Sequence, residues 1–416
     1  MKNNRIICVN FIIFLIILQF FCFNFCKFSI NSDYENNHTF AFFKNTNINQ
    51  VKNNQNKSNQ NNKKDKVESS AKAMVTMESN SGRILYSKNE NERLPMASTT
   101  KIITAIVAIE NCKDLDKKHQ IPKDAVGIEG SSIYLRTNEH LSIRELLYGL
   151  MLRSGNDSAV AIAIIVGGSL ENFVKMMNDF CARIKLDNTS IVTVNGLHDD
   201  KHFTSALDLA KVTSYALKNN TFRKIVSAKN AKISDENAKN GERYLKNKNK
   251  LLWNLDGATG VKTGYTKKAG RCFVGSAKKN NLEIICVVLD CPLMFEECSN
   301  LIKRAFCEFT NTKIFEKGVI FYKEINHKNG NIKIPVILTS DIYYPLSIKN
   351  FSEEFSEIKA RTEIIDNLSL PIKHSDEIGK LEITFKNNLI FSQKLFTINA
   401  EEKKEESLLK KIIRAF

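Results

Sequence analysis

The chain has 416 residues, enough for two domains, and 43% of them are hydrophobic, which supports a sizeable core and excludes a wholly disordered protein. Its 61 lysines and arginines exceed its 45 aspartates and glutamates, and the resulting net charge of +16 favours anionic surroundings. The sequence lacks an arginine-rich stripe with interleaved aromatic residues, so we predict no binding to nucleic acid.

The first residues have the composition of an export signal. The basic stretch MKNNR precedes the long apolar stretch IICVNFIIFLIILQFFCFNF. We therefore predict a signal peptide or N-terminal anchor over residues 1–28, and the length of the apolar stretch suits either outcome. Residues 29–69 are rich in asparagine and lysine and cannot bury a core, so we predict a disordered linker there.

An α/β (α+β) body is predicted for residues 70–310. Two short strands are expected in AMVTMESNSGRILYSKN, and apolar strands are expected again in GATGVKTGYTKKAGRCFVGSAKKNNLEIICVVLDC. Between them, helical patterns occur in LSIRELLYGLMLRSGNDSAVAIAIIVGG, SLENFVKMMNDFCARIKL and SALDLAKVTSYALKN. Helices on either side of these strands would surround one sheet.

The C-terminal part has a different pattern. Residues 311–399 contain short alternating strands with turns such as Asn329-Gly330, which predict a small all-β sandwich domain. Residues 400–416 predict an amphipathic helix that lies on an anionic membrane surface. The apolar face of this helix and its basic neighbours are Leu408, Leu409, Ile412, Ile413, Phe416, Lys410, Lys411 and Arg414. A helix that packs back on its own domain is the alternative.

The cysteines indicate no disulfide framework. Seven of the ten lie beyond the apolar leader, and none of them forms a Cys-x-x-Cys pair. An odd number of scattered cysteines is typical of buried, reduced thiols, which is our prediction here.

The stretch PMASTTKIITA places a lysine one helical turn after a serine. The apolar residues after Ser98 have helical spacing, so Ser98 and Lys101 would meet at the positive end of a buried helix. A neutral serine is a poor nucleophile and needs an adjacent base. Lys101 could be that base if burial, the helix terminus and a neighbouring cation lower its pKa. Lys262 is the candidate for that cation.

Two further patterns follow in order. Ser154-Gly155-Asn156 interrupts an apolar helical hairpin, and Lys262-Thr263-Gly264 enters a strand. Each tripeptide is common by itself, and Ser-x-x-Lys occurs at four other places in this chain. Together and in this order they are typical of penicillin-binding proteins and class A β-lactamases.

The chain resembles the serine D-alanyl-D-alanine carboxypeptidases, the low-molecular-mass penicillin-binding proteins of the S11 peptidase family. The resemblance extends over residues 70 to 416 and includes LPMASTTKIITAIVAIE, SGNDSAVAIA, NGLHDDKHFTSALDLA, KNKNKLL and GVKTGYTKKAGRCFVGSA. It implies a β-lactamase-like penicilloyl-serine transferase domain, followed by the family's C-terminal β domain and a membrane-anchoring tail.

The resemblance also implies the reaction. The terminal D-alanine of a peptidoglycan pentapeptide would be removed through an acyl-enzyme on Ser98, without a cofactor or metal. β-Lactams would acylate the same serine as inhibitors. The enzyme would be exported and would work at the outer face of the cytoplasmic membrane, in the cell envelope.

Roles follow for the remaining motif residues. Ser154 would relay a proton to the leaving group, and the Asn156 amide would hold the lysine base and the substrate backbone. Lys262 and Thr263 would attract the terminal carboxylate of a peptide that pairs with their strand, while Gly264 allows close backbone approach.

The oxyanion hole is assigned by resemblance alone. It would consist of the backbone N–H groups of Ser98 and Tyr265. Such donors are worth about 2.7–4 kcal/mol each in comparable sites.

Three local features depart from this pattern. A loop that usually has Asn-Pro-x-Gly-Leu is here residues 193–197, TVNGL. The segment 292–298, PLMFEEC, lacks the arginine that family members often direct to the substrate carboxylate, and Arg271 is the candidate replacement. The histidines and aspartates of HDDKH, residues 198–202, are predicted to lie at the surface and not to bind a metal.

Two alternative functions stay open at this point. A class A β-lactamase would need a Glu-x-x-Leu-Asn loop, which Glu171-Asn172-Phe173 does not match. A non-catalytic penicillin-binding sensor or envelope protein would keep the fold, and the missing arginine leaves that hypothesis available.

Overall fold

The computed structural model describes residues 39–40, 68–235, 240–327, 330–365 and 375–397. The predicted leader, the predicted C-terminal helix and most of the predicted linker lie outside the described residues.

The chain divides into two compact units, residues 1–41 and 42–416. The first unit contributes only the two-residue strand β1 (Thr39–Phe40) to the described part. The second unit contains every other described helix and strand.

A five-stranded antiparallel sheet in the order β3-β2-β10-β9-β8 lies at the centre of residues 68–308, the α/β body. The strands β9 and β10 are joined by Asn280 and Asn281, both with positive φ, as a tight hairpin requires. The sheet consists of β2 (Ala73–Glu78), β3 (Ile84–Lys88), β8 (Ala258–Thr266), β9 (Gly270–Lys279) and β10 (Leu282–Leu289). These are the strands that the sequence predicts.

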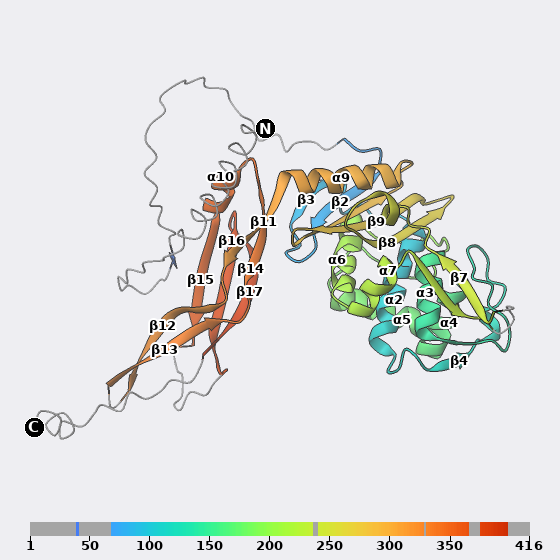
Figure 1. The fold of residues 1–416 in the computed structure, drawn as a ribbon, viewed down its shortest axis with the longest axis horizontal. Helices are drawn as coiled ribbons and strands as arrows, with labels where there is room; N and C mark the ends of the chain where they lie inside the picture. Colours follow the sequence, from blue (N-terminus) through green and yellow to red (C-terminus); the bar gives the residue numbers. More distant parts are fainter. Residues whose placement is uncertain (1–38, 41–67, 236–239, 328–329, 366–374, 398–416) are drawn as a thin grey trace, which may run out of the picture. The chain divides into compact units, whose positions relative to one another are not determined.

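The two faces of this sheet are covered by different helices. Alternate residues of β10 belong to two separate apolar clusters: Ile285 lies in the larger one, and Ile284 packs with Leu301 in the smaller one. Figure 1 accordingly shows α9 (Met294–Glu308) on one side of the sheet and α2 and α6 on the other. The helices of the larger cluster are α2 (Lys101–Asn111), α4 (Asn156–Gly167), α5 (Leu170–Arg183), α6 (Ala206–Leu217) and α7 (Asn220–Ser227).

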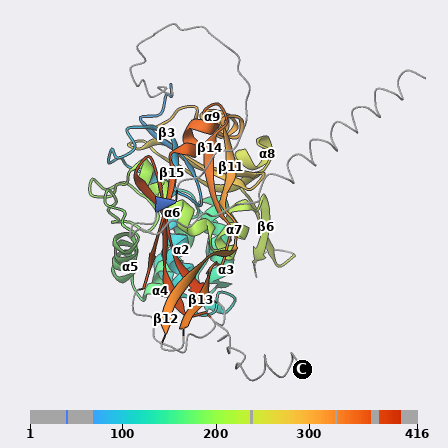
Figure 2. The same cartoon turned by 90° about the vertical axis from the view of Figure 1, so that its left-hand side faces the viewer.

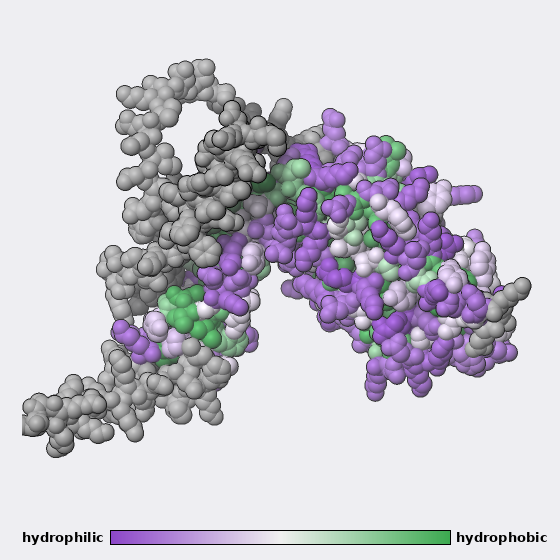
Figure 3. Space-filling model, viewed as in Figure 1, coloured by the Kyte–Doolittle hydropathy of each residue, from purple (hydrophilic) through white to green (hydrophobic). Residues whose placement is uncertain are grey.

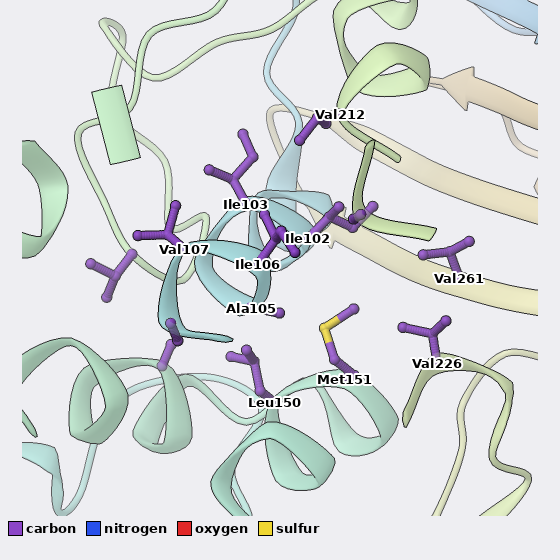
Figure 4. Close-up of a cluster of buried hydrophobic side chains, with 14 of the residues drawn as sticks. Ile102, Ile103, Ala105, Ile106, Val107, Leu150, Met151, Val212, Val226 and Val261 are labelled. Carbon is purple, nitrogen blue, oxygen red and sulfur yellow. The ribbon is translucent and has the colours of Figure 1, made fainter. Parts of the chain in front are cut away.

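Helix α2 lies in the middle of the larger cluster. Its residues from Lys101 to Ala108 are all buried. Figure 4 shows Ile102 and Ile106 with Met151 below them and Val261 of β8 to their right. Because the helix is enclosed, its first turn has a fixed position against β8.

Shorter elements complete the α/β body. A capping box at Ser142 begins α3, and the Ser205 side chain accepts a hydrogen bond at the start of α6. These elements are η1 (Ala97–Thr100), β4 (Lys118–Gln120), η2 (Lys123–Ala125), β5 (His140–Ser142), α3 (Ile143–Tyr148), the π-helix η3 (Gly149–Arg153), β6 (Asn230–Ser234), β7 (Glu242–Lys246) and α8 (Leu251–Asn254).

The strands predicted after residue 311 are present. They form one sheet containing β15-β16-β17-β13-β12 and a two-stranded sheet β11-β14 around a third apolar cluster. Figure 2 shows the paired β12 and β13 side by side. The elements are β11 (Phe309–Phe315), β12 (Gly318–His327), β13 (Gly330–Leu338), β14 (Ile342–Ser347), α10 (Phe351–Ser356), β15 (Ile358–Ile364), β16 (Glu377–Phe385) and β17 (Asn388–Thr397).

The visible surface of the α/β body is mainly hydrophilic, and the apolar patches on it are small and scattered (Figure 3). No single helix in the described ranges has both the length and the apolarity to span a membrane. Helices α4 and α5 satisfy those criteria only as a pair bent by 86°.

Replacing Ile106 by alanine should destabilise the α/β body by about 2–5 kcal/mol, because the cavity would form inside an enclosed helix. Trp253, the only tryptophan of the chain, lies in this body, so urea unfolding followed by its fluorescence measures the loss. Leu293→Ala, at a position 56% exposed, is the control and should change the unfolding free energy by less than about 0.5 kcal/mol. Equal effects of the two substitutions would contradict this description of the core.

Candidate active site

The nucleophile predicted from the sequence lies at the first turn of the enclosed helix. Ser98 belongs to the 3-10 turn η1, which continues directly into α2 at Lys101. Ala97, just before it, has φ +48°, a left-handed conformation that non-glycine residues seldom adopt. Ser98 is partly exposed, whereas Ala97, Thr99 and Thr100 are buried. The turn thus presents one hydroxyl group to solvent.

The Lys101 amine is fully buried and has three oxygen neighbours. Its Nζ lies 2.9 Å from Ser98 Oγ, 2.7 Å from Asn156 Oδ1 and 2.5 Å from the Asn195 carbonyl oxygen. The two carbonyl oxygens can only accept hydrogen bonds, while a hydroxyl can also donate. A neutral amine would therefore give its two hydrogens to Asn156 and Asn195 and direct its lone pair at the Ser98 hydroxyl, as a general base requires.

Asn156 reaches Lys101 because two helices meet at this point. The π-helix η3 ends at Arg153 and α4 begins at Asn156, so the predicted interruption of the helical hairpin is confirmed. The Asn156 Nδ2 group donates to the Glu129 carbonyl over 2.6 Å, which fixes the amide with its oxygen toward the lysine. The Asp157 carboxylate accepts from the backbone N–H groups of Ile133 and Leu135 and holds the same loop.

Ser154 lies between the two helices in a left-handed conformation, with φ 64° and ψ 35°. It is 5% exposed. Within the described part of the chain, the structure records no hydrogen bond from its hydroxyl. Its side chain is therefore available to a substrate group.

The strand β8 carries the third motif. It lies at the end of the five-stranded sheet, and among the described residues it pairs only with β9. Lys262 is 1% exposed, and its Nζ donates to the Thr263 carbonyl over 2.8 Å. Thr263 is partly exposed, and Tyr265 is 65% exposed. One edge of β8 can therefore accept an added peptide strand.

Gly264 brings this strand against the nucleophile. A Cβ atom at position 264 would lie 3.0 Å from the Ser98 nitrogen and 3.1 Å from the Thr99 nitrogen. Both contacts are with backbone atoms, which cannot rotate away. The motif needs glycine here for close packing and not for its backbone freedom, since the φ of Gly264 is outside the left-handed region.

Two buried lysines with lowered pKa values characterise the electrostatics. Burial lowers the pKa of Lys101 well below its usual value, and the charges of Lys262 and Lys248 lower it further, while Asp157 opposes them. Burial, followed by the charge of Lys248, lowers the pKa of Lys262 from 10.5 to about 7. Burial and Arg153 also lower the pKa of Lys248. Both effects favour the neutral, basic form of Lys101.

The structure adds two groups that sequence reasoning did not assign. The Asn195 carbonyl belongs to the TVNGL loop, whose sequence departs from the family pattern. Lys248 donates to Ser131 Oγ over 3.0 Å, and its charge lowers the pKa values of Lys101 and Lys262. It belongs to the segment KNKNKLL, which the sequence connects with the family only by resemblance. Arg271, the candidate replacement arginine, is exposed on β9 next to Tyr265 in the strand register.

One surface prediction is wrong. His198 is exposed, as predicted, and pairs with Asp200, but His202 is buried, at 3% exposure, because its backbone is tied to Asp199 and its ring lies against Thr100. Among the residues that the structure covers, no group of three or more histidine, cysteine or acidic side chains could hold a metal ion.

The seven described cysteines are free thiols, as predicted. Cys181, Cys272, Cys286, Cys291 and Cys298 are buried, whereas Cys112 is partly exposed and Cys307 is exposed.

Comparison with known families places two matches along the chain. Residues 54–292 match the S11 peptidase family, described as D-alanyl-D-alanine carboxypeptidase. Residues 309–403 match the C-terminal domain of penicillin-binding protein 5.

Individual proteins match over most of their length. D-alanyl-D-alanine carboxypeptidase DacF of Bacillus subtilis is 34% identical over 322 residues, which is 75% of this chain and 80% of that protein. DacA of Haemophilus influenzae is 30% identical over 79% of this chain and 84% of its own length. Among solved structures, penicillin-binding protein 5 from Haemophilus influenzae has a TM-score of 0.66 and 28% identity, and it covers 80% of this chain and 98% of its own.

Replacing Gly264 by alanine should destabilise the α/β body by about 1–3 kcal/mol, because β8 must move away from the first turn of α2. Urea unfolding followed by Trp253 fluorescence measures the difference. Lys267→Ala, at an exposed position just beyond β8, is the control. If both variants unfold like the wild-type protein, the close packing between Gly264 and Ser98 is refuted.

Proposed function

Because the chain belongs to the D-alanyl-D-alanine carboxypeptidase family of S11 peptidases, we propose that Ser98 is its nucleophile and Lys101 its general base. The enzyme is a serine-type hydrolase that removes the terminal D-alanine from peptidoglycan pentapeptides. The observation that carries these two roles is the buried Lys101 amine, whose lone pair faces Ser98 when its hydrogens bond Asn156 and Asn195.

Acylation begins with the transfer of the Ser98 proton to Lys101 Nζ. The Ser98 oxygen attacks the carbonyl carbon of the penultimate D-alanine, and the carbonyl oxygen becomes an oxyanion. The proximity of Gly264 to the Ser98 nitrogen supports the oxyanion hole proposed above, since the next backbone amide belongs to Tyr265.

The leaving D-alanine must receive a proton on its nitrogen. Lys101 holds that proton after the attack, and Ser154, whose hydroxyl has no hydrogen-bond partner among the described residues, relays it as the C–N bond breaks. Water then attacks the acyl-enzyme and gives a proton to Lys101, which passes it to the Ser98 oxygen as the ester bond breaks. The products are the shortened peptide carboxylate and the regenerated Ser98 hydroxyl.

Substrate binding is proposed for the open edge of β8. An extended peptide adds to this edge, and Thr263 with protonated Lys262 attracts its terminal carboxylate. Lys248 adds positive potential at the same place, which offsets the lack of an arginine in residues 292–298. β-Lactams, whose carboxylate and strained amide resemble the terminal dipeptide, acylate Ser98 in the same position.

The location follows from the substrate. Peptidoglycan pentapeptides lie outside the cytoplasmic membrane, so the leader of residues 1–28 would export the chain and the basic tail of residues 400–416 would hold it on the anionic membrane surface.

The β-lactamase alternative has no support from the site. Glu171, whose sequence context does not match the Glu-x-x-Leu-Asn loop, is exposed in the first turn of α5. The match of residues 309–403 to the C-terminal domain of penicillin-binding protein 5 also favours the carboxypeptidase.

Incubation of the full chain with a Lys-D-Ala-D-Ala peptide should release D-alanine, and Ser98→Ala should abolish the release. Fluorescent penicillin should label the wild-type protein and not the variant. Labelling without D-alanine release would support the sensor hypothesis instead, and the absence of both in folded protein would refute the proposed function.

The pH dependence of kcat/KM should be bell-shaped. The rate rises with pH as Lys101 loses its proton, and it falls above about pH 7 as Lys262 loses the charge that attracts the carboxylate. Bound substrate favours the protonated lysine, so the falling limb of kcat should lie at higher pH than that of kcat/KM.

Lys262→Arg is the matched variant for this profile, since arginine keeps its charge throughout the range. Its kcat/KM should show no fall near pH 7, even if the absolute rate is lower. A fall at the same pH in both proteins would assign the limb to another group.

A further inference from the structure

The loop of residues 192–197, which we call the Asn195 loop, is packed on the first turns of the catalytic helix. Its Asn195 carbonyl accepts from Lys101, and its Val194 carbonyl accepts from Thr104 Oγ1 over 2.7 Å. A Cβ atom on Gly196 would lie 2.0 Å from the Ala97 carbonyl oxygen, so the loop and the nucleophile turn touch. The position of the lysine base thus depends on this loop.

His202 connects the Asn195 loop to the catalytic helix by hydrogen bonds to both. Its Nδ1 accepts from the backbone N–H groups of Val192 at 3.0 Å and Thr193 at 3.3 Å. Its Nε2 lies 2.8 Å from Thr100 Oγ1, in the residue immediately before Lys101. The buried His202 ring therefore forms hydrogen bonds both with the Asn195 loop and with Thr100, which precedes Lys101.

The hydrogen bonds define the protonation state of this ring. The Thr100 hydroxyl donates its hydrogen to the Ala97 carbonyl at 2.7 Å, so it can only accept from His202. Nε2 must carry a hydrogen, and Nδ1, which faces two N–H donors, must not. Both sides of the ring independently require the neutral Nε2–H tautomer.

We propose that His202 is a positioning residue of the carboxypeptidase reaction: as a neutral imidazole it fixes the Asn195 loop to the catalytic helix and so keeps the Asn195 carbonyl on the Lys101 amine. The inference rests on the function proposed above. A proton on Nδ1 would face the N–H groups of Val192 and Thr193 and push the loop away.

The surroundings of His202 keep it neutral. Burial lowers its pKa from 6.5 to about 4; His198 and Lys101 lower it further, and only Asp199 acts in the opposite direction. The unfolded chain takes up the proton near pH 6.5 and the folded protein only near pH 4. This contribution to stability is therefore complete above about pH 6.5 and is lost as the pH falls toward 4.

The first test compares His202→Asn with His198→Asn in the full chain. Asparagine at 202 can place an oxygen near the Nδ1 position but cannot reach Thr100. The rate constant for acylation of Ser98 by fluorescent penicillin should fall about tenfold, which corresponds to one lost hydrogen bond. The noncovalent affinity for penicillin should not change, because the β8 edge is untouched. His198→Asn, which removes a histidine of the same segment, should retain the wild-type rate.

The second test alters Thr100, the partner of His202 Nε2 in this hydrogen bond. Thr100→Ser keeps the hydroxyl and should acylate at the wild-type rate, whereas Thr100→Val keeps the shape without the hydroxyl and should be about as slow as His202→Asn. The double variant with His202→Asn should be no slower than either single variant, since both remove the same bond. If His202→Asn does not fold, the Thr100 pair decides the question.

The fall of the acylation rate at low pH separates a positioning role from a purely structural one, because a purely structural role would not change how steeply the rate falls. The wild-type protein should lose activity below about pH 4–5 more steeply than His202→Asn, because only the wild-type ring takes up a proton there. Trp253 fluorescence at each pH confirms that the protein stays folded.

Different failures have different meanings. If wild-type protein neither releases D-alanine nor binds penicillin covalently, the proposed function fails. If the wild-type protein is active and His202→Asn or Thr100→Val acylates equally fast, or if their losses add, the positioning role of His202 is overturned.

Discussion

The structure depends on the enclosed amine of Lys101, which has no anionic hydrogen-bond partner among the described residues. An isolated charged ammonium group is costly to bury, so Lys101 must either find an anion or lose its proton. The contacts around it are the Ser98 hydroxyl and the carbonyl oxygens of Asn156 and Asn195, and the nearby lysines add repulsion. The neutral amine is therefore the stable state, and the same burial that removes its charge makes it a base for Ser98.

Four separate parts of the chain must meet for this to happen. The turn η1 carries the serine and the enclosed helix α2 the lysine, the π-helix and α4 present Asn156, the Asn195 loop presents its carbonyl, and β8 brings Lys262 to the open edge of the sheet. The two apolar clusters on either side of the sheet hold these parts at fixed distances. The α/β body is thus the scaffold that makes one proton transfer possible.

The sequence predicts those parts that depend on side-chain pattern. The strands β2, β8, β9 and β10, the helix after Ser98 and the interruption before Asn156 all follow from periodicity and turn residues. The role of the Asn195 loop could not be predicted, because a backbone carbonyl leaves no side-chain signature. The polar neighbours of His202 favour a surface position, although the residue is buried and each of its ring nitrogens has a hydrogen-bond partner. Lys248 has no motif of its own beyond its place in KNKNKLL.

The open edge of β8 also affects how copies of this protein behave toward one another. A sheet edge that accepts a substrate strand could equally accept the same edge of a second molecule, which is a common route to aggregation. Two exposed lysines, Lys267 and Lys268, follow the strand directly, and parallel pairing of two such edges would bring these charges together. Charge repulsion at the end of the strand thus disfavours that parallel pairing, whereas the carboxylate of a short peptide carries the opposite sign.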